Sequence, residues 1–169
     1  MIKRIFFLTP LLGLIISCSS FEFVYKTSDN IEYGVKYKTL LSISGDNKDI
    51  INSYLLNKIG EAGSNQTYIL SIVSSGLIEA AVIEVDATAS KFIIKHDLIY
   101  VLNSMPNNCI LFEKNILTEN SYEAKSAGYS FGTDLAEKEL STKNLHSNID
   151  IFLKELSINH NYLKCKNES

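Results

Sequence analysis

The chain has 169 residues, a formal net charge of −3 and a hydrophobic share of 46%. This length is typical of one domain, and so many apolar residues with so little net charge exclude a disordered chain. The balance of 16 basic against 19 acidic residues also excludes nucleic acid as a partner, because that affinity depends on Lys and Arg neutralising phosphates.

Residues 1–17 have the pattern of an export signal. Lys3 and Arg4 give a positive start, and residues 5–16 form an almost wholly apolar stretch without charge. A stretch of about a dozen residues is too short to cross a bilayer as a helix, which takes roughly 20. A short apolar core behind a basic start is typical of a secretory signal peptide, and we expect it to be removed.

The signal ends in a lipobox, the pattern that directs lipid attachment to a cysteine. Ile15, Ile16 and Ser17 precede Cys18, so that two aliphatic residues and a small one stand before a thiol that accepts a diacylglycerol. A hydrophobic helix with an accidental cysteine is the alternative. Three acyl chains on Cys18 would exceed the two signals that stable anchoring takes. Because position 19 is Ser and not Asp, we expect the periplasmic leaflet of the outer membrane as the destination.

The mature chain would have 152 residues and, without Lys3 and Arg4, a net charge of −5. A domain of about 150 residues buries roughly 68–70% of its unfolded surface, enough for one core. Two cysteines remain, Cys109 and Cys165, and in an oxidising periplasm they could form one disulfide or stay as two free thiols. The histidines lack ligand spacing, so we expect neither a metal nor another cofactor.

The first half of the mature chain predicts one strand and one helix. Alternating aromatic or aliphatic residues and lysines predict a strand from Tyr33 to Ile43. A helix over 47–60 follows, with Asp46 or Asn47 as its N-cap, and glycines at positions 60 and 63 end it. Its apolar residues recur at helical spacing: Ile50, Ile51, Tyr54, Leu55 and Ile59.

The second half predicts three strands and a long helix. The strands cover Thr67–Ser75, Ala89–Leu102 and 109–118, the last two joined by a turn over 103–108. In the middle strand apolar residues and His96 share one face, whereas Lys91, Lys95 and Asp97 share the other. The helix covers 127–156, and its apolar residues are Leu135, Leu145, Ile149, Phe152 and Leu156.

The predicted order is therefore β-α-β-β-β-α. This order favours an α+β two-layer sandwich, in which a sheet of about four strands is covered by two helices. We predict a signal peptide over 1–17, a lipidated cysteine and tether over 18–31, a single domain over 32–158 and a polar tail over 159–169.

Motifs of catalysis are absent from the sequence. There is no nucleophile elbow, zinc-protease motif, phosphate-binding glycine loop or calcium loop, so we do not expect an enzyme. His96 lies within a strand and is interpreted as a satisfied or half-exposed residue. Lys91 and Lys95 form a positive strip, which is either a solvated face or a contact for an anionic lipid headgroup.

The C-terminal half resembles the LptE family of lipopolysaccharide-assembly lipoproteins. The resemblance lies in FIIKHDLIYVL, a hairpin, and then TENSYEAKSAGYSFGTDLAEKELSTKNLHSNIDIFLKEL. A Tyr- and Ser-containing junction there leads into a long Ala/Leu helix; the matching positions are Ser121, Tyr122, Ser126 and Tyr129 in the junction and Leu135, Ala136, Ile149 and Leu156 in the helix. The segment after Cys18, Ser-Ser-Phe-Glu-Phe, departs from the Gly-Phe start of many relatives.

The resemblance implies a role without catalysis. LptE-like proteins plug the LptD β-barrel, assist its assembly and help deliver lipopolysaccharide to the cell surface. For this chain the resemblance implies an LptD-like barrel, lipopolysaccharide and the membrane as partners, with Lys91 and Lys95 as candidate contacts to lipopolysaccharide phosphates. The alternative is a periplasmic auxiliary lipoprotein of a lipid-trafficking ABC transporter.

Overall fold

The structure is a computed structural model that describes residues 34–83, 85, 89–123, 130–159 and 164–166. The predicted signal peptide, Cys18, the tether, and the junction residues Ser126 and Tyr129 lie outside the described residues. Six elements follow one another: β1 (Thr39–Gly45), α2 (Lys48–Ile59), β2 (Tyr68–Ile83), β3 (Ala89–Ser104), β4 (Cys109–Glu123) and α3 (Ser130–Asn159). This order confirms the predicted α+β fold.

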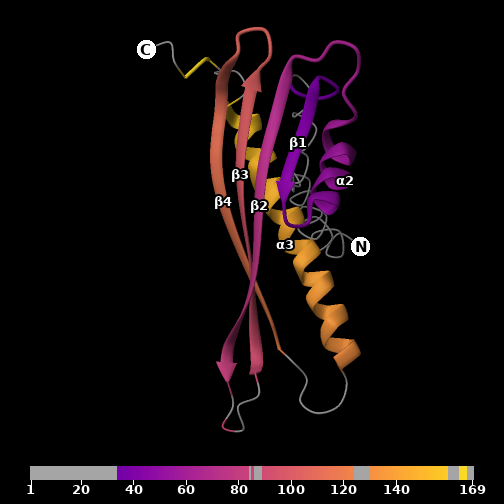
Figure 1. Ribbon diagram of the computed structural model, residues 1–169, viewed down its shortest axis with the longest axis vertical. Coiled ribbons are helices and arrows are strands. Elements are labelled where there is room, and N and C mark those ends of the chain that lie inside the picture. Colours follow the sequence, from indigo (N-terminus) through magenta and orange to yellow (C-terminus); the bar gives the residue numbers. More distant parts are fainter. Residues whose placement is uncertain (1–33, 84, 86–88, 124–129, 160–163, 167–169) are drawn as a thin grey trace, which may run out of the picture.

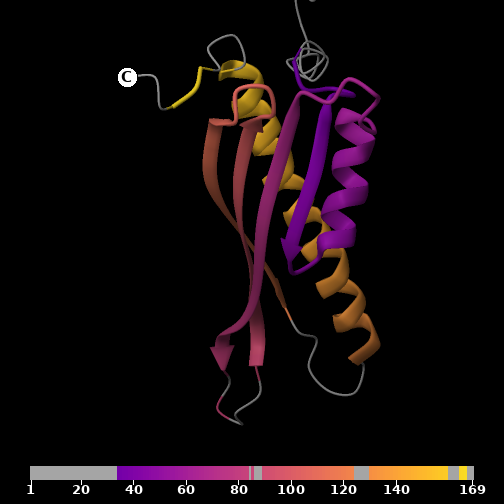
Figure 2. The ribbon, with the colours of Figure 1, turned by 45° about the horizontal axis from the view of Figure 1, so that its top comes forward.

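The four strands form one sheet in the order β1-β2-β3-β4. β1 runs parallel to β2, and the other two pairs are antiparallel. Both helices cover the same face of this sheet, and the other face, which we call the open face, carries no helix (Figures 1 and 2). α3 crosses behind the sheet from the distal end, where β2 ends and β3 begins, to the end where β3 turns into β4 (Figure 1).

The core lies between the sheet and the two helices. Every second residue of β3 from Ile94 to Leu102 is buried, as the period-two pattern predicts. The ring of Tyr100 stacks on Phe152 of α3 with 4.1 Å between centroids. The helices contribute residues at three- and four-residue steps, which confirms their predicted apolar stripes: Ile51, Leu55, Ile59, Leu145, Ile149, Phe152 and Leu156.

Leu135 is the exception among the predicted core residues of α3. Its side chain is 58% exposed. The buried residues of α3 all lie between Asn144 and Leu156, and none of the described residues before Asn144 in this helix is buried. The prediction for Leu135 was therefore wrong, because the first turns of the helix do not pack into the core.

The first strand begins later than predicted. The alternation starting at Tyr33 predicted a strand, but residues 34–38 form a turn and β1 begins at Thr39. Within the turn Tyr37 has a positive φ of 59°, and its backbone N–H donates to the carbonyl of Ile59 at 2.8 Å. The chain therefore turns over the C-terminal end of α2 before it enters the sheet.

The N-cap of α2 lies at one of the two predicted residues, but it does not cap the helix through its side chain. Asn47 is the N-cap, but its backbone is left-handed and its side chain makes no capping hydrogen bond. Asp46 does not cap the helix either, because its Oδ2 accepts the backbone N–H of Gly76 at 2.9 Å. At the other end Gly60, with a φ of 77°, terminates the helix as predicted.

All four strands and the long helix extend beyond their predicted ends, β1 and β3 by two residues each. β2 continues from Ser75 to Ile83, and β4 continues from Thr118 to Glu123. The extra residues of β2 are exposed on both faces, so they do not alternate between apolar and polar side chains as the residues of a half-buried strand do. Their backbones nevertheless pair with β3. α3 ends at Asn159, three residues after the predicted end.

Candidate functional site

The two predicted lysines lie on the open face of β3. They alternate with Ile94 and His96, whose side chains are buried on the helix face. Lys95 lies between Leu77 of β2 and Glu119 of β4, and Lys91 lies opposite Glu123. Four residues along a strand separate the two lysine Cα atoms by about 13 Å. The backbones of Lys91 and Lys95 are therefore too far apart to contact the same phosphate group, although the long side chains of both lysines lie on one face.

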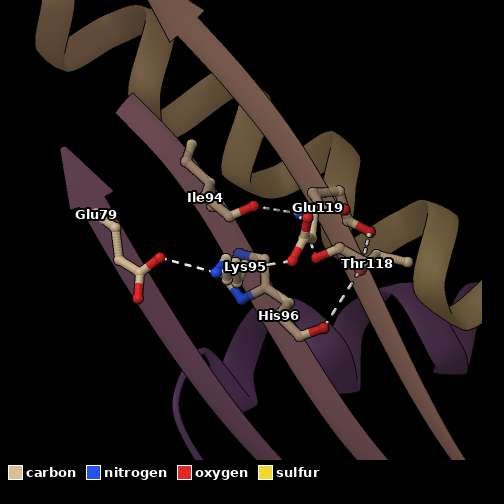
Figure 3. A network of polar contacts seen from close by, with 7 residues as sticks. Glu79, Ile94, Lys95, His96, Thr118 and Glu119 are labelled. Atoms are coloured by element: carbon tan, nitrogen blue, oxygen red, sulfur yellow. Dashed lines mark hydrogen bonds and ion pairs between the residues drawn. The ribbon is translucent and has the colours of Figure 1, made fainter. Parts of the chain in front are cut away.

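The charge of Lys95 is already matched by two carboxylates. Its Nζ lies 2.8 Å from Glu79 Oε2 and 3.8 Å from Glu119 Oε1, on the strands to either side (Figure 3). The hydrogen bond to Glu79, with the attraction of both carboxylates, raises the pKa of the Lys95 ammonium. A phosphate that approached Lys95 would compete with these two neighbours.

Lys91 differs from Lys95 in this respect. Among the described residues no ion pair of Lys91 occurs, although Glu123 is its register neighbour on β4. Of the two lysines, Lys91 is therefore the one whose charge is open to an external anion. The lipopolysaccharide contact itself stays a prediction for both residues.

Aliphatic side chains share the open face with these charges. Val73 and Ile99 are register partners on β2 and β3, and their side chains are 53% and 40% exposed. Leu77 and Leu117 are also exposed and lie on the strands on either side of β3. The open face thus presents apolar side chains next to ion-paired charges, a composition suited to contact with both polar and apolar groups.

The structure brings the two predicted cysteines together. Cys109, at the first residue of β4, and Cys165 form a disulfide with Cα atoms 5.5 Å apart. Beside it the backbone N–H of Lys166 donates to the carbonyl of Ile110 at 3.0 Å, and Lys166 Nζ lies 3.1 Å from Glu113. The C-terminal segment 164–166 is therefore fixed along the outer edge of β4, where it covers the start of a strand edge.

Neither a membrane span nor a metal site is found in the part of the chain that the structure describes. No helix there is long and apolar enough to cross a membrane. No group of three or more acidic, His or Cys side chains there could hold a metal ion. Cys18, the predicted lipid attachment site, lies outside the described residues.

Two asparagines one turn apart connect α3 to the sheet. Nδ2 of Asn144 donates to the carbonyls of Ile94 and Thr118, at 3.2 and 3.1 Å. Nδ2 of Asn148 donates to the carbonyl of Ile116 at 2.7 Å. Both asparagines are buried, so these hydrogen bonds fix the position of α3 along β3 and β4.

A cleft of about 550 Å³ opens on the helix face, where β1 ends and β2 continues. Its walls come from the start of α2, from the middle of β2 and from the first half of α3. The polar residues that line it are Asp46, Asn47, His96, Glu137, Lys138, Ser141 and Thr142. Glu137 also accepts a hydrogen bond from the hydroxyl of Tyr122 at 2.7 Å, and burial together with this bond raises the pKa of Tyr122 to about 12.

His96 lies in the wall of this cleft and is 3% exposed. Its Nε2 is 2.9 Å from the hydroxyl of Ser141, whereas its Nδ1 has no hydrogen-bond partner among the described residues. Burial lowers the pKa of His96, and the nearby Asp46 carboxylate opposes that shift in part. The ring passes so close to Gly76 that a Cβ there would lie 3.2 Å from Nδ1. The neutral imidazole is therefore the form that the fold accommodates.

Sequence reasoning missed the cleft and the asparagine contacts. The cleft joins positions 46, 76, 96 and 141, which no local spacing relates. For the asparagines a signal was present, because Asn144 and Asn148 directly precede Leu145 and Ile149 on the buried stripe of a helix. Polar residues that recur with the apolar period of a helix indicate buried hydrogen bonds.

Comparison with known proteins gives a match in fold. No protein-family model matches the chain, and no curated protein matches it in sequence. Among solved structures, a Caulobacter crescentus protein described as a lipoprotein is similar, with a TM-score of 0.58 and 14% identity over 78% of this chain and 96% of that one. Rare lipoprotein B from Shewanella oneidensis has a TM-score of 0.52 and 14% identity, over 73% of this chain and 96% of that one.

A third similar structure is a minor lipoprotein from Acinetobacter baumannii. Its TM-score is 0.54 with 16% identity, and the match covers 75% of this chain and 95% of that protein. At these identities the likeness concerns the fold: the β-α-β-β-β-α arrangement is one that several bacterial lipoproteins share.

Proposed function

We propose that this protein is a lipid-anchored subunit of the outer membrane, which plugs a lipopolysaccharide-assembly β-barrel of the LptD kind and helps deliver lipopolysaccharide to the cell surface. In this role it has no catalytic activity of its own. The observation that carries the proposal is the combination of a lipobox at Cys18 with a fold shared by bacterial lipoproteins. One of these, rare lipoprotein B, is LptE, the family that the sequence resembles.

The shape and surface of the domain are compatible with a place inside a barrel. The sheet and α3 form an elongated two-layer body (Figure 2). The interior of an outer-membrane barrel is polar, so a plug needs a polar surface. Ion pairs supply part of that surface here, with Lys95 between two glutamates on the open face and Lys58 beside Asp150 at 3.1 Å on the helix face.

The lysines of the open face are the proposed contacts to lipopolysaccharide phosphates. Because Lys95 is shared by Glu79 and Glu119, we expect Lys91 to contribute more to the binding of an external anion. Binding of purified lipopolysaccharide to K91E, K95E and the double variant tests this order, with K38E, an exposed lysine outside the strip, as the matched control. Unchanged affinity in the double variant would remove both residues from the site.

The main test is a pull-down from outer membranes with the affinity-tagged full chain. We expect one large β-barrel protein to co-purify, and we expect the Cys18→Ala variant to leave the outer-membrane fraction and to recover much less of the barrel. Recovery of inner-membrane transporter subunits instead would favour the auxiliary lipoprotein of a lipid-trafficking ABC transporter. Recovery of neither partner would remove both assignments.

A further inference from the structure

Among the residues that the structure describes, no strand occupies the position beside the distal half of β2 on the side of β1. β1 pairs with β2 only as far as Gly45 and Ser74, whereas β2 continues to Ile83 with β3 on its other side. The parallel pairing ends in two contacts: the N–H of Asp46 donates to the carbonyl of Ser74 at 3.0 Å, and Asp46 Oδ2 accepts the N–H of Gly76 at 2.9 Å. The side chain of Asp46 thus binds the N–H of Gly76, where the backbone of the next residue of β1 would otherwise pair.

The strand edge beyond this point has backbone groups without a strand partner. Ser74 and Gly76 direct their backbone groups towards β1, so the alternation of a strand directs those of Ile78 and Ala80 to the same side. No described strand pairs with Ile78 and Ala80 on that side. The regular register with β3 holds as far as Ala80, so the usable edge covers residues 76–80.

No described segment covers residues 76–80, and this stretch has neither proline nor lysine, although the register with β3 becomes irregular directly after Ala80. Natural proteins cover edges or place proline, lysine or bulges on them. The outer edge of β4 is covered at its start by the segment 164–166. Residues 76–80 read Gly-Leu-Ile-Glu-Ala, and their one charge, Glu79, is paired with Lys95 on the open face. The side chain of Ile78 is 44% exposed.

The cleft described above lies directly along this edge. Gly76, Leu77 and Ile78 form one wall, and residues 137–142 of α3 contribute another. A volume of about 550 Å³ is within the range of ligand pockets, roughly 300–1,000 Å³. The vacant strand position therefore has room on its helix side for the side chains of an added strand.

We propose that this edge binds an extended segment of a partner protein, which adds to β2 as a fifth strand. Backbone hydrogen bonds to Ile78 and Ala80 would supply affinity, as in other cases of strand addition. The cleft would favour a basic side chain, because the carboxylates of Asp46 and Glu137 line it against one lysine, Lys138. The inference stands on the fold and does not depend on the proposed function.

The experiment uses a blocked peptide, acetyl-Thr-Val-Lys-Val-Thr-amide, and the isotope-labelled full chain in detergent. We expect saturating peptide to slow hydrogen exchange at the amides of Ile78 and Ala80 by about tenfold, as a new hydrogen bond does. The same peptide with methylated backbone nitrogens is the matched control and should give no protection. A version with Glu in place of Lys should bind more weakly.

Two variants of the protein complete the test. Ile78→Pro removes an edge N–H at a position where proline is tolerated, and it should abolish peptide binding without loss of the fold. If this variant does not fold, Glu137→Gln still tests the charge: it should weaken binding of the lysine peptide several-fold more than binding of a methionine version.

Three results would overturn the proposal. The first is unchanged exchange at Ile78 and Ala80 at millimolar peptide. The second is equal binding of the methylated peptide, which would show that backbone pairing is not involved. The third is protection without peptide that increases with protein concentration, which would assign the edge to a second copy of this chain.

Discussion

The hydroxyl of Tyr100 on β3 donates a 2.8 Å hydrogen bond to Oδ1 of Asn148 on α3, and both residues are completely buried. The amide of Asn148 also donates to the carbonyl of Ile116. One side chain of α3 therefore satisfies polar groups of two neighbouring strands. Burial in this environment raises the pKa of Tyr100, so its hydroxyl stays protonated and available as a donor.

Replacement of Asn148 by alanine should destabilise the domain strongly. The Tyr100 hydroxyl would lose its acceptor in the core, and an unsatisfied buried polar group costs about 1–3 kcal/mol. With the cavity added, we expect a loss of about 3 kcal/mol in the free energy of unfolding, measured by urea denaturation. Asn159→Ala is the matched control because Asn159 is an exposed residue of the same helix; equal losses in the two variants would contradict this account.

Loss of the Cys109–Cys165 disulfide should lower stability through the unfolded chain. The bond closes a loop with a sequence separation of 56 residues. Loop-closure entropy for such a length gives about 4 kcal/mol, and typical measured values are 2–4 kcal/mol. Unfolding of the wild type with and without reductant should show this difference, whereas the C109S/C165S variant should not respond to reductant. A wild type that is equally insensitive would show that the bond contributes nothing.

Acidification should destabilise the protein through His96. Because its folded-state pKa lies below the unfolded value, the unfolded chain binds the proton first. The stability due to the neutral imidazole is therefore complete above the unfolded pKa of about 6.5 and is lost as the pH falls from there towards the folded pKa, with a slope of up to about 1.4 kcal/mol per pH unit.

The His96→Gln variant separates this effect from other titrations. Glutamine keeps a polar group near Ser141 and does not titrate. We expect the free energy of unfolding to fall less between pH 7.5 and pH 5.5 in this variant than in the wild type. His146, whose pKa burial also lowers, remains in both proteins and so cancels in the comparison. Identical pH dependence would exclude His96 as a cause.

Gly45 should not tolerate a side chain. Its φ is 91°, and a Cβ there would overlap the carbonyl oxygen of Ser74 on the paired strand. We expect Gly45→Ala to cost about 3 kcal/mol, from backbone strain and displacement of the strand pair. Gly63→Ala is the control, because its nearest contact would be an ordinary 3.7 Å; its effect on the thermal midpoint should be small. Comparable midpoints for both variants would refute the explanation.

The parts of the fold that follow from local periodicity were predictable. The alternation of apolar residues from Phe92 to Leu102 predicts the buried face of β3, because every second side chain points towards the helices. The start of β1 was not predictable in this way. In a strand, Val35 and Tyr37 would lie on the same face, yet Val35 is buried and Tyr37 is exposed. The reason is that residues 34–38 form a turn, which is fixed by contacts with α2.

The candidate site was predictable only in composition. The lysines of β3 could be placed on one face, but Glu79 and Glu119 reach Lys95 from strands 16 and 24 residues away in sequence. Ion pairs across strands depend on register, and register is set by the whole sheet. The empty position beside β2 depends in turn on where β1 stops, which the sequence pattern of β2 does not contain.

The position of the disulfide depends on the path of α3. The helix has 30 residues, about 45 Å in length, and Cys165 comes six residues after its last residue. It runs back along the sheet from the distal end, so Cys165 arrives beside Cys109 once the helix has packed along the strands (Figure 1). Packing of α3 along the sheet therefore brings the two thiols together, so formation of this bond should follow assembly of the core.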